Sequence, residues 1–137
     1  MKKKVLVLCT GNSCRSQMAE GWLRHFGGDH LDVYSAGVET HGLNPQAVRV
    51  MGEADIDISG HTSTHIDEYS DIDFDLVITV CDNARERCPV FPSRSEKIHR
   101  NFSDPGRAEG TEEQRLDQFR KVRDEIRDFS RELAERS

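Results

Sequence analysis

Short apolar runs alternate with amphipathic stretches along the chain, and polar turns separate them. Four of the apolar runs predict β-strands, over Lys3–Cys9, Leu31–Ala36, Phe74–Val80 and, with the weakest apolar character, Ile98–Phe102. The first and third runs are apolar almost throughout, which is typical of central strands in a parallel sheet.

Three other stretches repeat apolar residues at the spacing of an amphipathic helix. The first has its apolar positions at Met18, Ala19, Trp22, Leu23 and Phe26, and stops at Gly27 and Gly28. The second begins at Pro45, a residue favoured in the first helical turn. The third starts at a capping box of Thr111 and Gln114 and continues through Leu116, Phe119, Val122, Ile126, Phe129 and Leu133. Strands that alternate with helices predict an α/β fold, a single domain over residues 1–137 with a four-stranded parallel sheet and helices on both faces.

The net charge of −6 argues against a nucleic-acid partner, which a basic surface would have to hold. The apolar run after the N-terminal lysines covers only Val5–Leu8, shorter than the core of about 7–15 residues in a secretory signal. No stretch approaches the roughly 20 apolar residues of a membrane span. We therefore expect a cytoplasmic monomer that binds neither nucleic acid nor membranes. The acidic balance also means that an anionic substrate must be held by local groups.

The four cysteines are Cys9, Cys14, Cys81 and Cys88. The cytosol keeps thiols reduced, so a structural disulfide framework is not expected. Structural zinc sites usually have paired ligands two to four residues apart, and neither cysteine pair fits that spacing well. The cysteines are therefore interpreted as reactive thiols, and no metal site is predicted.

The segment between the first predicted strand and the first predicted helix has the properties of an anion-binding loop. In open α/β sheets, ligands bind at the carboxyl ends of the strands, and a helix N-terminus there offers backbone N–H groups and a favourable dipole. Gly11 permits tight backbone conformations, and the planar guanidinium of Arg15 matches two oxygens of a tetrahedral oxyanion. The predicted anion-binding residues are Thr10, Gly11, Asn12, Ser13, Cys14, Arg15 and Ser16.

Cys9 opens the same loop, so its sulfur is expected to face the bound anion. The groups that attract the anion also stabilise a thiolate, and the Ser16 hydroxyl can donate a hydrogen bond to it. For Cys14, in contrast, the backbone amide is expected to matter more than the sulfur. One loop thus combines a nucleophile with an oxyanion cradle.

The pattern Cys-x5-Arg-Ser after an N-terminal buried strand resembles the low-molecular-weight tyrosine phosphatase superfamily. The longer run CTGNSCRSQMAEGW resembles its thioredoxin-coupled arsenate reductase branch. The resemblance continues through YSAGVETHGLNPQAV, the Cys81 and Cys88 pair, Asp104-Pro105 and GTEEQR, so it covers nearly the whole chain. It implies a low-molecular-weight phosphatase-like fold and a role in arsenic detoxification.

The resemblance also implies roles for individual residues. Cys9 would attack arsenate, and Asp104 would act as general acid, although an aspartate before proline is also a common turn cap. Cys81 directly follows the third predicted strand and Cys88 comes seven residues later, with Arg85 and Arg87 between them. This is the arrangement expected of a disulfide relay from Cys9 to Cys81 to Cys88, recycled by thioredoxin.

The alternative activity is that of a tyrosine phosphatase. Its relatives carry aromatic residues around the site, often a tyrosine after Asp-Pro, whereas here Gly106 and Arg107 follow. This favours a small inorganic substrate, arsenate, with phosphate and sulfate as competing anions and a weak phosphatase side activity. A non-enzymatic phosphate- or redox-sensing module would use the same loop. Thioredoxin, glutaredoxin and a low-molecular-weight thiol all remain open as reductants, and no tightly bound cofactor is expected.

Asn12, Glu20 and Ser35 match positions that bind a potassium ion in some related reductases. At the fourth position, where those relatives carry an aspartate, this chain has Thr64. His61 and His65 are four residues apart but lack a convincing third metal ligand, so we expect both to be surface residues.

Overall fold

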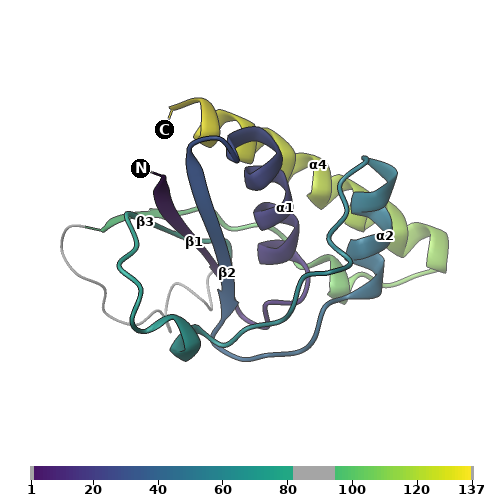
Figure 1. Cartoon of the computed structure of the whole chain (residues 1–137). Helices are drawn as coiled ribbons and strands as arrows, with labels where there is room; N and C mark the ends of the chain where they lie inside the picture. The colour runs from purple at the N-terminus through teal and green to yellow at the C-terminus, as the bar shows by residue number, and fades with distance from the viewer. Residues whose placement is uncertain (1, 82–94, 137) are drawn as a thin grey trace.

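The computed structural model of the chain describes residues 2–81 and 95–136 and contains one four-stranded parallel sheet (Figure 1). Its strands are β1 (Lys3–Cys9), β2 (Leu31–Gly37), β3 (Leu76–Thr79) and β4 (Glu96–His99), in the spatial order β2-β1-β3-β4. The two strands with the most apolar sequences, β1 and β3, lie in the middle of the sheet. The predicted fold class is confirmed.

The fourth strand begins two residues earlier than the sequence predicted, so the prediction of its bounds was wrong. Within the described part of the chain, β4 lies at the edge of the sheet and pairs with β3 alone, and its first two residues, Glu96 and Lys97, are exposed. An edge strand therefore lacks the continuous apolar run on which the prediction relied. The predicted residues still pair with the sheet, because the Phe102 amide donates to the Val80 carbonyl oxygen at 3.0 Å.

The α-helices pack together on one face of the sheet, and a short 3-10 helix lies on the other face (Figure 1). Their bounds are α1 (Arg15–Gly27), α2 (Pro45–Glu53), η1 (Ile66–Tyr69), η2 (Pro105–Arg107) and α4 (Glu112–Arg136), where η denotes a 3-10 helix. On β2, Ser35 contacts Glu20 of α1, whereas its neighbour Tyr34 packs against Tyr69 of η1. Because successive side chains of a strand point to opposite faces, α1 and η1 lie on opposite sides of the sheet.

The helix ends follow their sequence signals. Asn44 caps α2 by accepting a hydrogen bond from the Gln46 amide at 2.8 Å, just ahead of Pro45. Thr111 and Gln114 form the predicted reciprocal capping box at the start of α4. Among the described residues, no helix has both the length and the apolar character needed to cross a membrane.

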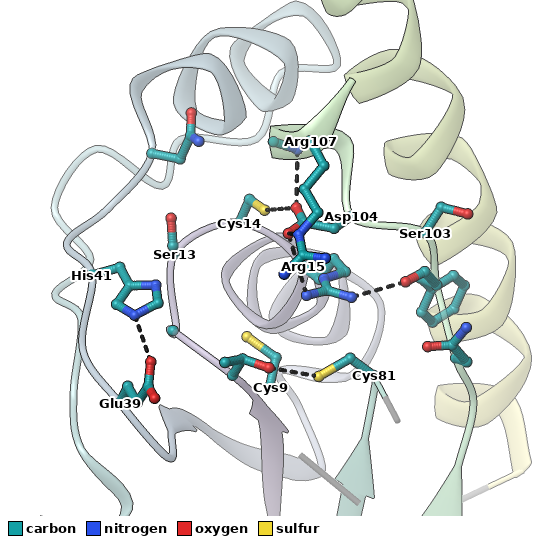
Figure 2. Close-up of a pocket in the computed structure, with 16 residues that line it drawn as sticks. Cys9, Ser13, Cys14, Arg15, Glu39, His41, Cys81, Ser103, Asp104 and Arg107 are labelled. Atoms are coloured by element: carbon teal, nitrogen blue, oxygen red, sulfur yellow. Dashed lines mark hydrogen bonds and ion pairs between the residues drawn. The ribbon is translucent and has the colours of Figure 1, made fainter. Parts of the chain in front are cut away.

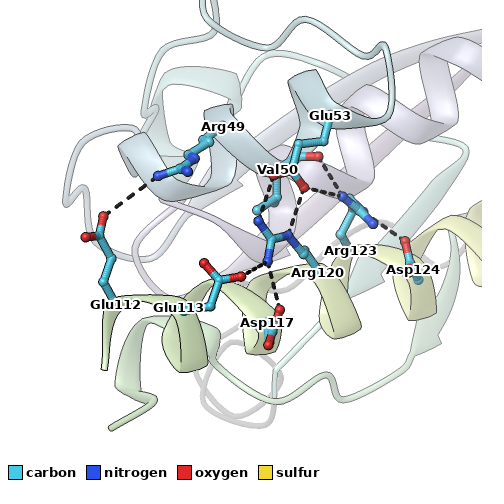
Figure 3. A network of polar contacts seen from close by, with 9 residues as sticks. All are labelled: Arg49, Val50, Glu53, Glu112, Glu113, Asp117, Arg120, Arg123 and Asp124. Carbon is cyan, nitrogen blue, oxygen red and sulfur yellow. Dashed lines mark hydrogen bonds and ion pairs between the residues drawn. The ribbon is translucent and has the colours of Figure 1, made fainter. Parts of the chain in front are cut away.

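A network of charged side chains joins α2 to α4 (Figure 3). Arg120 donates to both oxygens of Glu53, at 3.0 and 2.9 Å, and Arg123 donates to Glu53 at 3.1 Å and to the Val50 carbonyl at 2.9 Å. These hydrogen bonds hold the pKa of Glu53 below its usual range, and the largest effect comes from Arg120. The network fixes the end of α2 remote from its Asn44 cap.

Candidate active site

The carboxyl ends of β1 and β3 open into a cavity of about 850 Å³ (Figure 2). It is lined by the loop between β1 and α1, the segment after β2, Cys81 after β3 and the loop after β4. The lining residues are Cys9, Thr10, Gly11, Ser13, Cys14, Arg15, Glu39, His41, Asn44, Cys81, Asn101, Phe102, Ser103, Asp104, Gly106 and Arg107. Of the predicted loop residues, only Asn12 and Ser16 do not line it, because they are fully buried.

The backbone of the loop is anchored from outside at five successive carbonyl oxygens, those of residues 9–13. They accept hydrogen bonds, in chain order, from Val38 N, Glu39 N, His41 N, Gln17 Nε2 and Asn44 N, at 3.2, 2.8, 3.0, 3.1 and 3.0 Å. In a planar trans peptide the N–H points away from the C=O. The amides of residues 10–14 therefore point to the other side of the loop and form a concave nest suited to an oxyanion.

The segment 38–44 that supplies four of these donors was not identified from the sequence as part of the site. Nor was Gly37, the last residue of β2, which directly precedes this segment. A Cβ atom on Gly37 would collide with the Glu39 carbonyl oxygen and lie 2.8 Å from the Asn12 nitrogen. A glycine at the end of a buried strand is the one signal that could have indicated this close approach of two backbones.

Cys9 lies in a short chain of hydrogen bonds with two buried residues. Its Sγ is 2.9 Å from Ser16 Oγ, and Ser16 donates to Asn12 Oδ1 at 2.7 Å. Because the serine has one hydroxyl hydrogen, a neutral Cys9 thiol must be the donor to Ser16. When Cys9 is a thiolate, the same hydrogen can turn to the sulfur, as expected for stabilisation of the nucleophile.

The guanidinium of Arg15 is held at the cavity, as predicted. Its Nη1 donates to the Phe102 carbonyl at 3.0 Å, and its Nη2 lies 3.7 Å from Asp104 Oδ2. The buried Nε has no hydrogen-bond partner among the described residues. A tetrahedral oxyanion on the loop would offer oxygens to this guanidinium, so the residues present fit such a ligand.

Asp104 is both a turn cap and a cavity residue. Its Oδ1 accepts from the Gly106 amide at 2.9 Å, which caps η2, while its Oδ2 lies 3.7 Å from Arg15 and 3.7 Å from Arg107. The Cys14 thiol is 3.7 Å from Oδ1. Burial, followed by the nearby charges of Asp104 and Cys9, raises the pKa of Cys14 to about 12, so Cys14 remains a neutral thiol at physiological pH.

The second reactive cysteine of the prediction, Cys81, lines the same cavity as Cys9 (Figure 2). Its Sγ lies 3.2 Å from the Thr10 hydroxyl oxygen, and its side chain is buried. Cys9 is the last residue of β1, and Cys81 lies two residues after the end of β3. These strands are parallel neighbours, so their carboxyl ends meet at one edge of the sheet. Cys88, with Arg85 and Arg87, lies outside the described residues.

Comparison with known proteins places the chain in a family. The family described as low molecular weight phosphotyrosine protein phosphatase matches residues 4–136. The chain belongs to this family. A curated relative, the arsenate reductase of Halalkalibacterium halodurans, is 55% identical over 125 residues, which cover 91% of this chain and 90% of the relative.

Solved structures of arsenate reductases share the fold of this phosphatase-family chain. One in the oxidized state superposes with a TM-score of 0.85 at 32% identity, and one in the phosphate binding state with 0.79 at 34% identity. Each covers 98% of both chains. The resemblance inferred from the sequence is confirmed.

The residues that match the potassium positions of related reductases meet protein partners here. The Glu20 carboxylate accepts from Ser35 Oγ at 2.5 Å and pairs with Arg24 at 3.1 Å. Asn12 donates its side-chain amide to the carbonyl oxygens of Ser35 and Thr64, at 3.4 Å each. This arrangement does not fit a potassium ion, because a guanidinium already balances the carboxylate and Thr64 adds no charge.

The expectation that His61 is a surface residue was wrong. Its side chain is only 14% exposed and lies between Gln17 Oε1, at 3.0 Å, and Glu20 Oε2, at 3.4 Å. Gln17 also donates to the Asn12 carbonyl of the loop, so His61 helps to position a side chain that anchors the anion loop. His65 is 39% exposed, and its ring caps η1 by accepting from the Asp67 amide.

Proposed function

We propose that this phosphatase-family chain is a cytoplasmic, monomeric arsenate reductase coupled to thioredoxin. The observation that carries the proposal is the pair of thiols, Cys9 and Cys81, at one cavity beside an oxyanion cradle. A phosphatase needs only the first thiol. The names of the relatives support the same activity.

The first step is attack of the Cys9 thiolate on the arsenic of bound arsenate. An arsenate oxygen leaves as water, and Asp104 supplies its proton as general acid. The inward amides of the loop and the guanidinium of Arg15 stabilise the negative charge that develops on the remaining oxygens. The product is a Cys9–arsenic(V) adduct.

The second step is the reduction. The Cys81 thiolate attacks Cys9 Sγ, a disulfide forms between them, and the electron pair of the sulfur–arsenic bond passes to arsenic. Arsenic(V) becomes arsenic(III), and arsenite leaves. Cys88 then attacks Cys81, releases the Cys9 thiolate and leaves a Cys81–Cys88 disulfide, which the thioredoxin dithiol reduces. The two electrons thus come from thioredoxin.

Phosphate and sulfate have the shape and charge to occupy the same cradle as competing anions. A phosphate adduct on Cys9 has no comparable reduction to follow, so selectivity for arsenate arises in the redox step. Slow hydrolysis of such an adduct by water would give a weak phosphatase side activity.

The deciding experiment measures arsenate-dependent NADPH oxidation with thioredoxin and thioredoxin reductase, in parallel with a glutathione and glutaredoxin system. We expect turnover with thioredoxin, its loss in Cys81→Ser, and accumulation of a Cys9–Cys81 disulfide with one arsenite per enzyme in Cys88→Ser. Rapid hydrolysis of an aryl phosphate without arsenate reduction would support the phosphatase alternative. Anion binding without any turnover would support the sensing module.

A further inference from the structure

The two oxygens of the Asp104 carboxylate have different surroundings. Oδ1 accepts from the Gly106 amide and faces the Cys14 thiol, so it is occupied by the turn. Oδ2 is met by two guanidiniums, those of Arg15 and Arg107, at 3.7 Å each. A proton for the leaving oxygen would have to be carried on Oδ2, where two positive charges now oppose it.

The two arginines differ in how firmly they are held. The Arg15 side chain is 12% exposed and is anchored on the Phe102 carbonyl. The Arg107 side chain is 89% exposed, and its contact with Asp104 is longer than a strong charge-assisted hydrogen bond. Arg107 is therefore free to reorient within the cavity opening, above Asp104 in Figure 2.

The turn that carries Arg107 does not depend on its side chain. The Arg107 amide donates to the Asp104 carbonyl oxygen at 3.2 Å, and the Asp104 side chain caps the turn by accepting from the Gly106 amide. Among the described lining residues, the basic side chain besides the two arginines is His41, which is already paired with Glu39 at 2.8 Å. Arg107 is thus an exposed cation in the lining of the cavity. Its partner is Asp104, the proposed proton donor.

We propose that Arg107 captures the oxyanion, pairing with Asp104 before an anion binds and transferring to the anion once it is bound on the loop. This transfer removes a positive charge from Oδ2 and leaves Asp104 better able to carry the proton. It also gives an acidic protein a local attraction for an anionic substrate. The inference rests on the proposed function for its substrate, although oxyanion capture itself can be measured without turnover.

The test compares Arg107→Ala and Arg107→Lys with Arg131→Ala, which removes the same charge from α4 away from the cavity. Calorimetry would measure phosphate and arsenate binding to the reduced full-length protein at several ionic strengths, and steady-state assays would give kcat and KM. For Arg107→Ala we expect oxyanion affinity to fall and arsenate KM to rise by roughly three- to tenfold, with kcat within about twofold. The salt dependence of binding should become shallower, and Arg107→Lys should restore most of the affinity.

Equal affinities and equal salt dependence in Arg107→Ala and Arg131→Ala would overturn the inference. So would a fall in kcat with unchanged KM, since capture acts on binding. A wild type that binds phosphate but does not reduce arsenate would instead refute the proposed function, and the binding comparison would still report on Arg107.

Discussion

The cavity has two parts that are built in different ways. The floor, residues 9–16, is the anion loop, whose carbonyl oxygens at residues 9–13 are all hydrogen-bonded from outside. The rim consists of Glu39, His41, Asp104 and Arg107, whose side chains are 30–89% exposed and form the ion pairs His41–Glu39 and Arg107–Asp104. The floor is thus fixed by main-chain contacts, whereas the rim depends on exposed side chains.

This difference separates two tasks of the site. Dipoles that are fixed before the reaction stabilise developing charge without any cost of reorientation, and that is what the floor provides. Exposed charges guide encounter and adjust to the ligand, but water and salt screen them. Chemistry should therefore be most sensitive to changes in the floor and in the proton donor, and recognition to changes in the rim.

The largest effect is expected for Cys9→Ser. A serine hydroxyl is a far weaker nucleophile than a thiolate, so all arsenate turnover should disappear. The amides of the loop and Arg15 remain, so calorimetry should detect phosphate binding close to that of the wild type. Substantial arsenate reduction by this variant would refute the proposed mechanism.

A smaller loss is expected for Asp104→Asn, which alters the rim and leaves the floor in place. Asparagine keeps the shape and can still accept from the Gly106 amide, but it cannot donate the proton. Single-turnover arsenite formation should slow by roughly 10²–10⁴-fold, the range typical of general acid catalysis. An unchanged rate would leave Asp104 with only its turn-capping role.

The floor itself can be disturbed through Gly37→Ala. The added methyl group would press on the Glu39 carbonyl and the Asn12 amide, displacing segment 38–44 and the loop it anchors. We expect turnover to fall by roughly 10²–10³-fold, comparable with loss of one oxyanion donor, and phosphate affinity to fall with it.

Gly52→Ala is the matched control for this substitution. Gly52 lies in α2, where an added Cβ meets nothing within 4 Å. Alanine in a helix should leave phosphate binding unchanged and raise stability slightly. If both variants retained wild-type binding, the main-chain account of the floor would be wrong.

The sequence allowed the floor to be predicted better than its supports. Because β1 is an unbroken apolar run and the loop follows it directly, the positions of Cys9, Arg15 and the helix start could be inferred locally. The roles of Gly37 and His61 depend on chain segments more than 20 residues away from the loop in sequence. Such contacts arise only when β2 and the segment beyond it are placed beside β1. A glycine at the end of a buried strand hints at the close approach at Gly37, but nothing near His61 in the sequence indicates its contact with Gln17.

The smallest effect is expected outside the cavity, in the network between α2 and α4. Arg120 and Arg123 lower the pKa of Glu53 from its usual value near 4.5, so the ionised carboxylate is favoured in the folded protein. A group of this kind stabilises the fold above the unfolded-state pKa, and the contribution is lost as pH falls through the lower folded-state value. Glu53→Gln should therefore lower Tm by a few degrees at pH 7, corresponding to about 1 kcal/mol or less for a partly exposed pair.

Thermal unfolding from pH 7 down to pH 3 would check this expectation. The Tm difference between wild type and Glu53→Gln should shrink progressively below about pH 4.5, where the carboxylate is protonated first in the unfolded chain and then, at lower pH, in the folded protein. Glu113→Gln is the control, since Glu113 is 72% exposed and its described contact is with Arg120 alone, so its effect should be smaller. Phosphate affinity should not change in either variant. A Tm difference that persisted unchanged at pH 3 would mean that Glu53 acts through its packing and not through its charge.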